Sequence, residues 1–300
     1  MKLLLFGKGG QVGWELQRSL APLGEVVALG SGSREPCGDF TDLDGIARTV
    51  RKAAPDVIVN AAAYTAVDKA ESEPELARTV NAEAPGVLAR EARDCGAWLV
   101  HYSTDYVFDG RGERPWTETD ATDPLSVYGR TKRDGEAALL ESGCRHLIFR
   151  TSWVYGARGA NFAHTMIRLA REREALTVIN DQFGAPTGAE LLADVTAHAI
   201  RMALNQLELG GLYHLAAAGE TTWYDYAVFI LELARKAGIA LKVAPEAVNP
   251  VPAREFPLPA PRPHNSRLNT NRLRAAFGLR LPPWQDGVSR MLAETLKGVP

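Results

Sequence analysis

Short apolar runs and amphipathic segments alternate along the first half of the chain. Leu3–Phe6 is a continuous apolar run that ends at Gly7, a pattern typical of a strand buried on both faces. Gly10–Leu23, which follows it, carries apolar residues at helical spacing. The same alternation continues to about residue 150. It predicts strands at Glu25–Leu29, Asp56–Asn60, Trp98–Tyr102 and His146–Phe149, and helices at Asp42–Ala53, Pro74–Cys95 and Ser126–Leu140.

Strands that alternate with helices indicate right-handed βαβ units and a parallel sheet covered on both faces. The predicted fold class is therefore α/β, a Rossmann-type doubly wound parallel sheet, with a smaller mixed C-terminal substrate domain. Beyond residue 150 the alternation loosens. Helices are predicted at Phe162–Arg173, Glu190–Leu204, Trp223–Ala237, Thr270–Phe277 and Trp284–Leu296, and short strands at Leu176–Ile179 and Leu212–Leu215.

Domain boundaries follow from this change of pattern. Residues 1–150 are predicted to form the dinucleotide-binding, catalytic domain, and 151–300 mainly the substrate domain. We expect the chain to return to the first domain near 175–187 and 212–240, where the short strands would complete the sheet. Pro245–Pro263 holds seven prolines in nineteen residues, which excludes a helix or a central strand. It is either a linker or a rigid loop over a site.

Composition narrows the class of protein. With 300 residues, 46% hydrophobic and 23% charged, the chain is ordinary for a globular protein. A net charge of −2 argues against nucleic-acid binding. No apolar run approaches the roughly 20 residues that cross a membrane, and the start is too short for a signal-peptide core. The three widely spaced cysteines argue against a disulfide framework or a zinc site and favour the reducing cytoplasm.

A glycine-rich turn lies between the first strand and the first helix. Gly7, Gly10 and Gly13 form a GxxGxxG pattern, with Gln11 and Val12 between the second and third glycines. Glycine permits a tight turn, close approach of a pyrophosphate and close packing of helix on strand, and the helix N-terminus offers free N–H groups to phosphates. The strand–turn–helix context predicts dinucleotide binding rather than a simple connecting turn.

The end of the second strand bears on the choice of dinucleotide. An acidic residue there usually holds the ribose 2′-hydroxyl of NAD, but this strand ends at Gly30. Nearby hydroxyls and Arg34 could accept a 2′-phosphate instead. The sequence therefore favours NADPH over NADH, unless Arg34 is only a solvated loop charge.

A YxxxK motif supplies candidate acid–base chemistry. Tyr128 and Lys132 are four residues apart, which places them on one face of the predicted helix. A nearby ammonium group favours the phenolate and moves the pKa of a tyrosine toward neutral pH. Thr104 ends a predicted strand, and the carboxyl ends of such strands face the ligand crevice of an open α/β sheet. We therefore expect Tyr128, Lys132 and Thr104 to be the catalytic residues.

The glycine turn, the strand-end hydroxyl and YxxxK together resemble the extended, nucleotide-sugar-modifying branch of the short-chain dehydrogenase/reductases. Further segments, spread over essentially the whole chain, resemble one family of that branch, the dTDP-4-dehydrorhamnose reductases. These segments are Asn60–Glu71, Ser103–Gly110, Arg150–Tyr155, Asp181–Thr187 and Arg262–Ser266.

The resemblance implies a role for each matching residue. Gly10, Gln11 and Val12 would hold the pyrophosphate in the turn that Gly7 and Gly13 shape. Further cofactor contacts would come from Asp39 and Phe40 at the adenine, from Ala63, Tyr64 and Thr65 beyond the third strand, from Tyr102 near the nicotinamide, and from Lys132 at its ribose. Tyr128 would be the proton donor. Thr104, Asp105 and Trp153 would contact the sugar, although Trp153 could instead be a core residue. Arg262 either pairs with a nucleotide phosphate or is a surface charge.

The implied reaction is reduction of a 4-keto nucleotide sugar, which yields dTDP-L-rhamnose for surface polysaccharides such as the lipopolysaccharide O-antigen. The family is also associated with Mg²⁺, for which Glu15, Glu190 and Glu294 are the candidate ligands. The expected partners are a dTDP-sugar and, if the chain is oligomeric, a second copy in a homodimer. Neither nucleic acid nor membrane is expected.

Two alternative functions stay open at this point. One is a nucleotide-sugar epimerase or 4,6-dehydratase. By resemblance, the dehydratases carry Asp-Glu after the central Thr. This chain has Asp105-Tyr106 there, which argues against dehydration. The other is a non-catalytic regulatory subunit, such as a relative that binds dinucleotide and modulates methionine adenosyltransferase.

Overall fold

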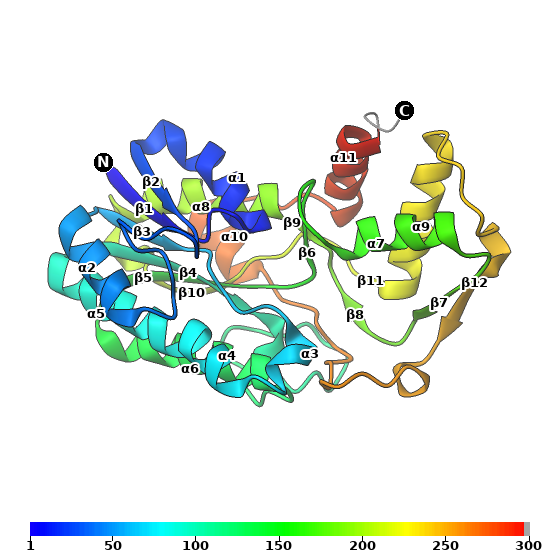
Figure 1. Cartoon of the computed structure of the whole chain (residues 1–300), viewed down its shortest axis with the longest axis horizontal. Coiled ribbons are helices and arrows are strands. Elements are labelled where there is room, and N and C mark those ends of the chain that lie inside the picture. Colours follow the sequence, from blue (N-terminus) through cyan, green and yellow to red (C-terminus); the bar gives the residue numbers. More distant parts are fainter. Residues whose placement is uncertain (297–300) are drawn as a thin grey trace.

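The computed structural model describes residues 1–296, and at its centre six parallel strands form one sheet (Figure 1). The last four residues of the predicted substrate domain, 297–300, lie outside the described residues. The strand order is β10-β5-β4-β3-β1-β2. These strands are β1 (Lys2–Phe6), β2 (Glu25–Leu29), β3 (Val57–Asn60), β4 (Trp98–Thr104), β5 (Arg145–Thr151) and β10 (Gly211–His214).

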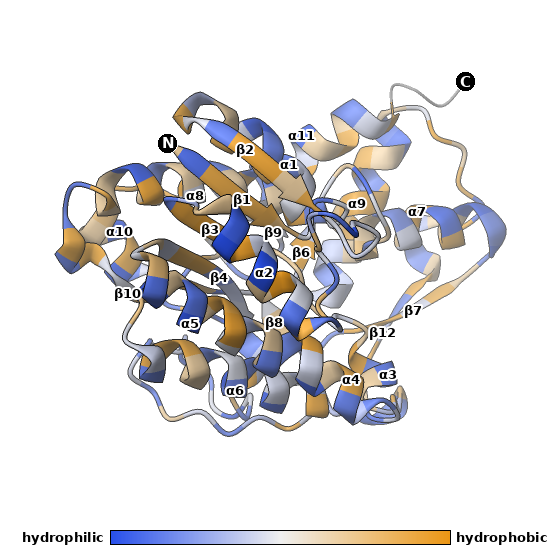
Figure 2. Cartoon of the chain, turned by 60° about the vertical axis from the view of Figure 1, so that its left-hand side comes forward, coloured by the Kyte–Doolittle hydropathy of each residue, from blue (hydrophilic) through white to orange (hydrophobic). Residues whose placement is uncertain are grey.

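Helices cover both faces of this sheet because successive strand residues point to opposite sides. Leu3 and Leu5 pack on one side, and Leu4 and Phe6 on the other. The first side is covered by α1 (Gln11–Leu20), α8 (Ala189–Ala203) and α10 (Asn271–Phe277). The second is covered by α2 (Leu43–Ala53), α5 (Ala84–Cys95) and α6 (Val127–Ser142). Figure 2 shows the hydrophobic colour concentrated along the strands and the adjoining helix faces. This sheet lobe confirms the predicted fold class.

A second lobe stands beside the carboxyl ends of the strands (Figure 1). Its helices are α7 (Phe162–Glu172), α9 (Trp223–Lys236) and α11 (Trp284–Leu296), and β7 (Leu176–Ile179) pairs in parallel with β12 (Val248–Val251). Two small strand pairs connect the lobes. They are β6 (Val154–Tyr155) with β9 (Thr187–Gly188), and β8 (Phe183–Gly184) with β11 (Thr221–Thr222).

The prediction that both short strands complete the large sheet is wrong for one of them. β10 does pair with β5, which places the chain near residue 212 back in the sheet lobe. The rest of the predicted return at 212–240 is wrong, because α9 packs with α7 and α11 in the second lobe. The strand near Leu176 does not, because Leu176 and Val178 are buried against α7 and α9 in the second lobe. The helix α8, by contrast, packs on the sheet beside α1, a return that the sequence pattern did not predict.

The remaining helices show one further departure. The predicted helix Pro74–Cys95 is divided into α4 (Pro74–Arg78), a π-helical turn at Thr79–Glu83, and α5. Pro85 has no N–H to continue the α-helical ladder, which explains the break. A short helix, α3 (Val67–Ala70), precedes them. Single 3₁₀ turns are at Ala21–Leu23, Asp105–Val107, Leu207–Leu209, Pro245–Ala247 and Ala253–Glu255.

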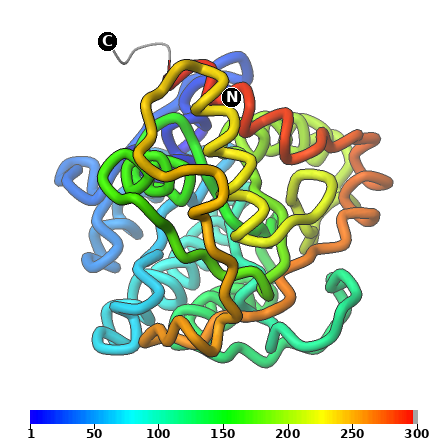
Figure 3. The backbone as a smooth tube through the Cα atoms, turned by 90° about the vertical axis from the view of Figure 1, so that its right-hand side faces the viewer, coloured from blue at the N-terminus to red at the C-terminus, as the bar shows by residue number. Residues whose placement is uncertain are grey.

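The proline-rich segment runs from the second lobe back to the sheet lobe. It contains β12, in which Pro250 occupies one strand of a two-stranded pair, as expected for a proline outside a central strand. Figure 3 shows its continuation passing close to the segment that contains α3. There Arg262 donates two hydrogen bonds to the carboxylate of Asp68, at 2.8 and 2.7 Å. The segment is therefore a connection that is fixed at its far end.

Candidate active site

The glycine-rich turn has the close backbone packing that the sequence predicts. A Cβ on Gly13 would overlap the carbonyl oxygen of Gly7, and one on Gly7 would press into the backbone of Ala61. Gly10 caps α1 without a side-chain hydrogen bond, and the first turn of the helix holds no acidic residue. The N–H groups at this end of α1 are thus free of a competing carboxylate, which fits a pyrophosphate.

A pocket of about 510 Å³ opens from this turn across the carboxyl ends of the central strands. It lies beside the gap between β1 and β3, where the order of successive strands reverses across the sheet, and such a switch point is where open α/β sheets bind ligands. Predicted site residues at the pocket are Gly10, Gln11, Val12, Ala63, Thr65, Tyr102, Thr104, Asp105, Tyr128, Lys132 and Trp153. Lining residues that the sequence did not single out are Ala61, Val67, Ser103, Tyr106, Thr151, Ser152, Val154 and Trp223.

Tyr128 and Lys132 enter the pocket from the first turns of α6. Ser126 caps this helix by accepting a hydrogen bond from the backbone N–H of Gly129. Burial raises the pKa of Tyr128 to about 12, although a hydrogen bond with Thr104 works in the opposite direction. We expected Lys132 to lower this pKa, so the direction of the shift is opposite to the prediction. Tyr128 is therefore a neutral phenol at pH 7, ready to donate a proton.

Lys132 is fully buried beneath the pocket. Its Nζ donates a hydrogen bond of 2.6 Å to the carbonyl oxygen of Tyr102 and lies 3.3 Å from Nε2 of His101. Burial lowers the pKa of Lys132 to about 8, against an opposing effect of Glu136. No pattern in the sequence singled out His101, so its contact with Lys132 was missed.

Thr104 and Asp105 bring unsatisfied polar atoms to the pocket. Oγ1 of Thr104 donates to Oδ1 of Asp105 at 3.1 Å and accepts from the backbone N–H of Tyr106. Oδ2 of Asp105 is buried with no hydrogen-bond partner within residues 1–296, and the same holds for the hydroxyls of Ser103 and Thr151. Burial raises the pKa of Asp105 to about 7. Buried polar groups are normally paired, so these atoms favour a polar ligand such as a sugar.

Trp153 occupies the opposite wall in a strained conformation. Its φ of +48° lies in the left-handed region that non-glycine residues rarely adopt. Its indole stacks on that of Trp223, with ring centroids 3.6 Å apart and planes 14° apart. Backbone strain at a pocket residue is often linked to function. The geometry thus supports the predicted ligand contact better than a core role.

Asp39, Phe40 and Tyr64 do not line this pocket. Phe40 is buried edge-on against Phe6, and the Tyr64 hydroxyl donates to Glu73 at 2.7 Å. Asp39 pairs with Arg34 at 3.1 Å and accepts from Thr41, whose hydrogen bonds lower the pKa of this carboxyl. Asp39 and Phe40 nevertheless lie beyond the end of β2, the side on which an adenosine would extend.

Arg262 also lies outside the pocket. Because its guanidinium forms the bidentate pair with Asp68, the structure offers a use for it that the sequence did not predict, as a clamp between the proline-rich segment and α3. A free surface charge does not describe this arrangement, and the predicted contact with a nucleotide phosphate stays a prediction.

The three magnesium candidates do lie together, around a small cavity between α1, α8 and α11. Each is close to an arginine. Arg18 pairs with Glu15 at 3.2 Å, and Arg290 pairs with Glu294 at 3.2 Å and lies 3.8 Å from Glu190. Over residues 1–296, no group of three potential ligands has a geometry that could hold a metal ion. The magnesium prediction is therefore not supported.

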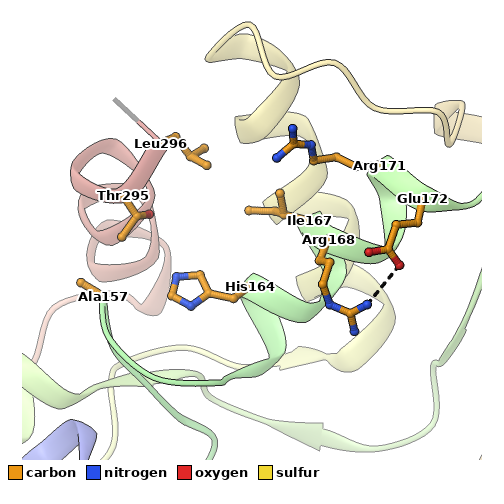
Figure 4. Close-up of a pocket in the computed structure, with 8 residues that line it drawn as sticks. All are labelled: Ala157, His164, Ile167, Arg168, Arg171, Glu172, Thr295 and Leu296. Atoms are coloured by element: carbon orange, nitrogen blue, oxygen red, sulfur yellow. Dashed lines mark hydrogen bonds and ion pairs between the residues drawn. The ribbon is translucent and has the colours of Figure 1, made fainter. Parts of the chain in front are cut away.

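A larger cavity, of about 680 Å³, lies elsewhere, between α7 and α11 (Figure 4). Arg168 pairs with Glu172 along its rim, and His164 and Ile167 also line it. None of the predicted site residues lines this cavity. Size alone therefore does not identify the active site.

Two further predictions concern the whole chain. No described helix is long and apolar enough to cross a membrane. The three cysteines are free thiols, with Cys37 and Cys144 buried and Cys95 exposed. This agrees with the expectation that no disulfide framework holds the fold.

Comparisons with known proteins place this geometry in context. Residues 1–297 match the family model described as the RmlD substrate binding domain. The chain is 63% identical over 294 residues to a dTDP-4-dehydrorhamnose reductase of Escherichia coli strain K12, covering 98% of each chain. A crystal structure of such a reductase from Clostridium acetobutylicum matches with a TM-score of 0.88 at 35% identity, covering 98% of this chain and 99% of that one. One from Bacillus anthracis, in complex with NADP, matches with a TM-score of 0.87 at 34% identity and the same coverage.

Proposed function

Because the chain belongs to the dTDP-4-dehydrorhamnose reductase family, we propose that it reduces the C4 keto group of dTDP-4-dehydro-L-rhamnose with NADPH. The product is dTDP-L-rhamnose. The observation that carries this proposal is the single pocket in which the free N-terminus of α1, the neutral phenol of Tyr128 and the unpaired carboxyl oxygen of Asp105 meet. Each matches one part of the reaction: a dinucleotide, a proton donor and a hydroxylated substrate.

Each part of the proposed reaction is assigned to a particular side chain. When bound, the nicotinamide supplies a hydride to the substrate carbon. Tyr128 donates its phenolic proton to the carbonyl oxygen as negative charge develops there. Thr104, at the end of β4 and in hydrogen-bond contact with Tyr128, would turn its hydroxyl hydrogen from Asp105 toward that charge and stabilise it. Lys132 would hold the cofactor ribose, and the free oxygen of Asp105 would accept a hydrogen bond from a sugar hydroxyl.

The second lobe contributes the other wall of the pocket. Trp153 and Trp223 present a stacked aromatic surface on which an apolar sugar face can lie. The surrounding walls reduce the water around the reacting carbonyl. Electrostatic stabilisation by Thr104 and Tyr128 is stronger in such a site than in open solvent.

The preference for NADPH rests on the end of β2. Gly30 leaves no carboxylate at the usual position, and the side chain of Lys8 passes 3.6 Å from where a Cβ of Gly30 would be. Arg34 is the second cation nearby, although it is partly engaged by Asp39. The 2′-phosphate of NADPH would thus lie near the positive charges of Lys8 and Arg34. The 2′-hydroxyl of NADH would find only one carboxylate there, that of Asp39, which already pairs with Arg34.

The test is oxidation of the reduced cofactor, followed by its near-ultraviolet absorbance, with dTDP-4-dehydro-L-rhamnose as substrate. We expect rapid, substrate-dependent oxidation, with kcat/KM higher for NADPH than for NADH. Lys8→Ala should reduce that ratio, and Lys52→Ala, an exposed lysine on α2, is the matched control. Equal use of both cofactors by the wild type would overturn the preference and leave the reductase assignment intact.

The same assay separates the alternatives. An epimerase or dehydratase would convert its nucleotide sugar without net oxidation of added NADPH. A regulatory subunit would bind the cofactor but turn over no sugar. The position after Asp105 favours the reductase, because it holds Tyr106, whose ring packs edge-on against Tyr128, rather than a second acid.

A further inference from the structure

A buried chain of polar groups leads from the backbone to Lys132. Asn60 ends β3, and His101 is its direct neighbour on β4. The backbone N–H of Ala62 donates to Oδ1 of Asn60 at 3.0 Å, and Nδ2 of Asn60 lies 3.0 Å from Nδ1 of His101. Nε2 of the same imidazole lies 3.3 Å from Nζ of Lys132. All three side chains are at most 2% exposed.

The first member of this chain fixes the direction of every hydrogen bond that follows. A backbone N–H can only donate, so Oδ1 of Asn60 must face Ala62, and the amide nitrogen of Asn60 must face the imidazole. Nδ1 of His101 must then accept. A neutral imidazole that accepts at Nδ1 carries its hydrogen on Nε2, which points at Lys132.

The donors and acceptors of the same groups exclude the opposite direction of hydrogen bonding. If His101 accepted at Nε2 from an ammonium group, its Nδ1–H would have to donate to the oxygen of Asn60. The amide nitrogen of Asn60 would then face the N–H of Ala62, and two donors would meet in a buried site. A buried donor left without a partner is strongly disfavoured.

We infer that Asn60 and His101 are positioning residues that direct this one-way chain onto Nζ of Lys132 and so favour its neutral amine. The amine has the lone pair that the Nε2–H of His101 requires, and it keeps an N–H for the carbonyl oxygen of Tyr102. An ammonium group would instead face another donor.

The charges around Lys132 are consistent with this inference. On its own helix, Glu136 favours the ammonium form but is itself held by two hydrogen bonds from Arg150 of β5. Asp105 affects the pKa of Tyr128, whereas Glu136 is the charge that affects the pKa of Lys132. His101 is kept neutral, since burial lowers its pKa well below the ordinary value. Burial lowers the pKa of Lys132, and the hydrogen bonds from Asn60 and His101 act in the same direction.

The consequence for turnover rests on the proposed function, in which Lys132 lies beneath the proton donor. A lysine that releases its proton close to neutral pH can exchange protons with its surroundings during the catalytic cycle, whereas an ordinary lysine would stay charged. Asn60 and His101 would thus set the pH at which Lys132 changes its charge without touching the substrate.

The direct test is the tautomer of His101 in the wild-type protein, measured by NMR with ¹⁵N-labelled histidine at neutral pH. We expect Nε2 to carry the hydrogen. The signal is assigned by its absence in His101→Gln, or by replacing the other histidines one at a time if that variant does not fold. A hydrogen on Nδ1 would overturn the inference. This measurement needs no turnover, so its outcome is independent of the proposed function.

The second test reverses the direction of the hydrogen bonds that lead to Lys132. In Asn60→Asp, both carboxylate oxygens accept, so His101 can donate from Nδ1 and accept from Lys132 at Nε2. The ¹³C signal of the Lys132 side chain, assigned with Lys132→Met, should then titrate about 1–3 pH units higher than in the wild type. The tautomer of His101 should change in the same variant, which separates the reversal from a simple effect of added charge.

A matched control is His146→Gln, which replaces a half-buried histidine on the neighbouring strand β5. Its ring interacts with the carbonyl oxygen of Cys144 and does not belong to the chain. The Lys132 titration should be unchanged in this control. The inference fails if Asn60→Asp folds, leaves the tautomer of His101 as it was and does not move the titration of Lys132.

Discussion

Burial, more than the neighbouring charge, governs the ionisable groups at the floor of the pocket. It raises the pKa values of Tyr128 and Asp105 and lowers that of Lys132, so each of the three groups is shifted toward its uncharged form. A reduction that delivers a proton from a phenol benefits from this arrangement, because the donor is fully protonated at neutral pH. The sequence motif identified the groups, but their protonation follows from packing.

The first prediction concerns the proton donor. Tyr128→Phe removes the phenolic hydroxyl and keeps the ring that packs against Tyr106. We expect kcat to fall by about 10²–10⁴-fold, the usual range for a lost general acid, while the Kd for NADPH stays unchanged. Steady-state kinetics and a fluorescence titration measure the two quantities. Turnover close to that of the wild type would remove Tyr128 from this role.

The second prediction is a pH dependence of stability from Asp105. Its pKa in the folded protein, about 7, lies above the ordinary value of 3.8. The stability linked to its protonated form is therefore fully present below about pH 4 and is lost as the pH rises through about 7. Asp105→Asn cannot ionise, so its Tm should decline less than that of the wild type between about pH 5 and pH 8. Parallel pH profiles of the two proteins would contradict the assignment.

At the scale of single elements, the turn between β1 and α1 depends on its backbone packing. Gly13→Ala would force a methyl group onto the carbonyl oxygen of Gly7, and we expect a loss of about 1–3 kcal/mol in the free energy of unfolding together with weaker NADPH binding. Gly9→Ala is the matched control in the same turn. A Cβ there meets no atom within 4 Å, so stability should stay within about 0.5 kcal/mol. Denaturant unfolding and cofactor titration distinguish the two variants.

Elements with a strong local signal could be predicted from the sequence, and those fixed by distant partners could not. The buried strands β1 and β3 and the capped helix α6 match their predicted positions closely. The strand at Leu176–Ile179 was identified as a strand but assigned to the wrong sheet. Its apolar residues can bury against either lobe, and only the packing of α7 and α9 decides between them.

Within the candidate site, too, residues with a local sequence pattern could be predicted, and residues fixed by distant partners could not. The glycine turn, Thr104 and the pair Tyr128–Lys132 carry local patterns that chemistry can interpret. Trp223 does not, because a tryptophan at the start of a helix has no distinctive spacing. It reaches the pocket only through its stacking on Trp153, seventy positions away. Unpaired buried atoms, such as Oδ2 of Asp105, are likewise visible only after folding.

At the scale of the whole molecule, the clamp between Arg262 and Asp68 ties the chain that leaves the second lobe to the sheet lobe. Arg262→Gln removes the two hydrogen bonds to Asp68, and a third to the carbonyl oxygen of Ala260, from a half-buried site where such a loss costs roughly 1–3 kcal/mol. If the clamp holds the pocket walls together, KM for the sugar nucleotide should rise about tenfold while kcat is largely kept. Arg168→Gln, which breaks an exposed pair on α7, is the control and should leave KM unchanged.

If Arg262→Gln and its partner variant Asp68→Asn both bind the sugar nucleotide as the wild type does, the clamp stabilises only the fold. Their melting temperatures would then be the only property to change.

The stacked indoles of Trp153 and Trp223 give the protein an optical property of its own. Two indoles in face-to-face contact couple their electronic transitions, which produces a paired positive and negative band in the far-ultraviolet circular dichroism spectrum. Because both rings line the pocket, a ligand that slides against or between them must alter this couplet. The wild-type enzyme therefore carries a built-in spectroscopic reporter of occupancy, and either Trp→Phe substitution should silence it without any added dye.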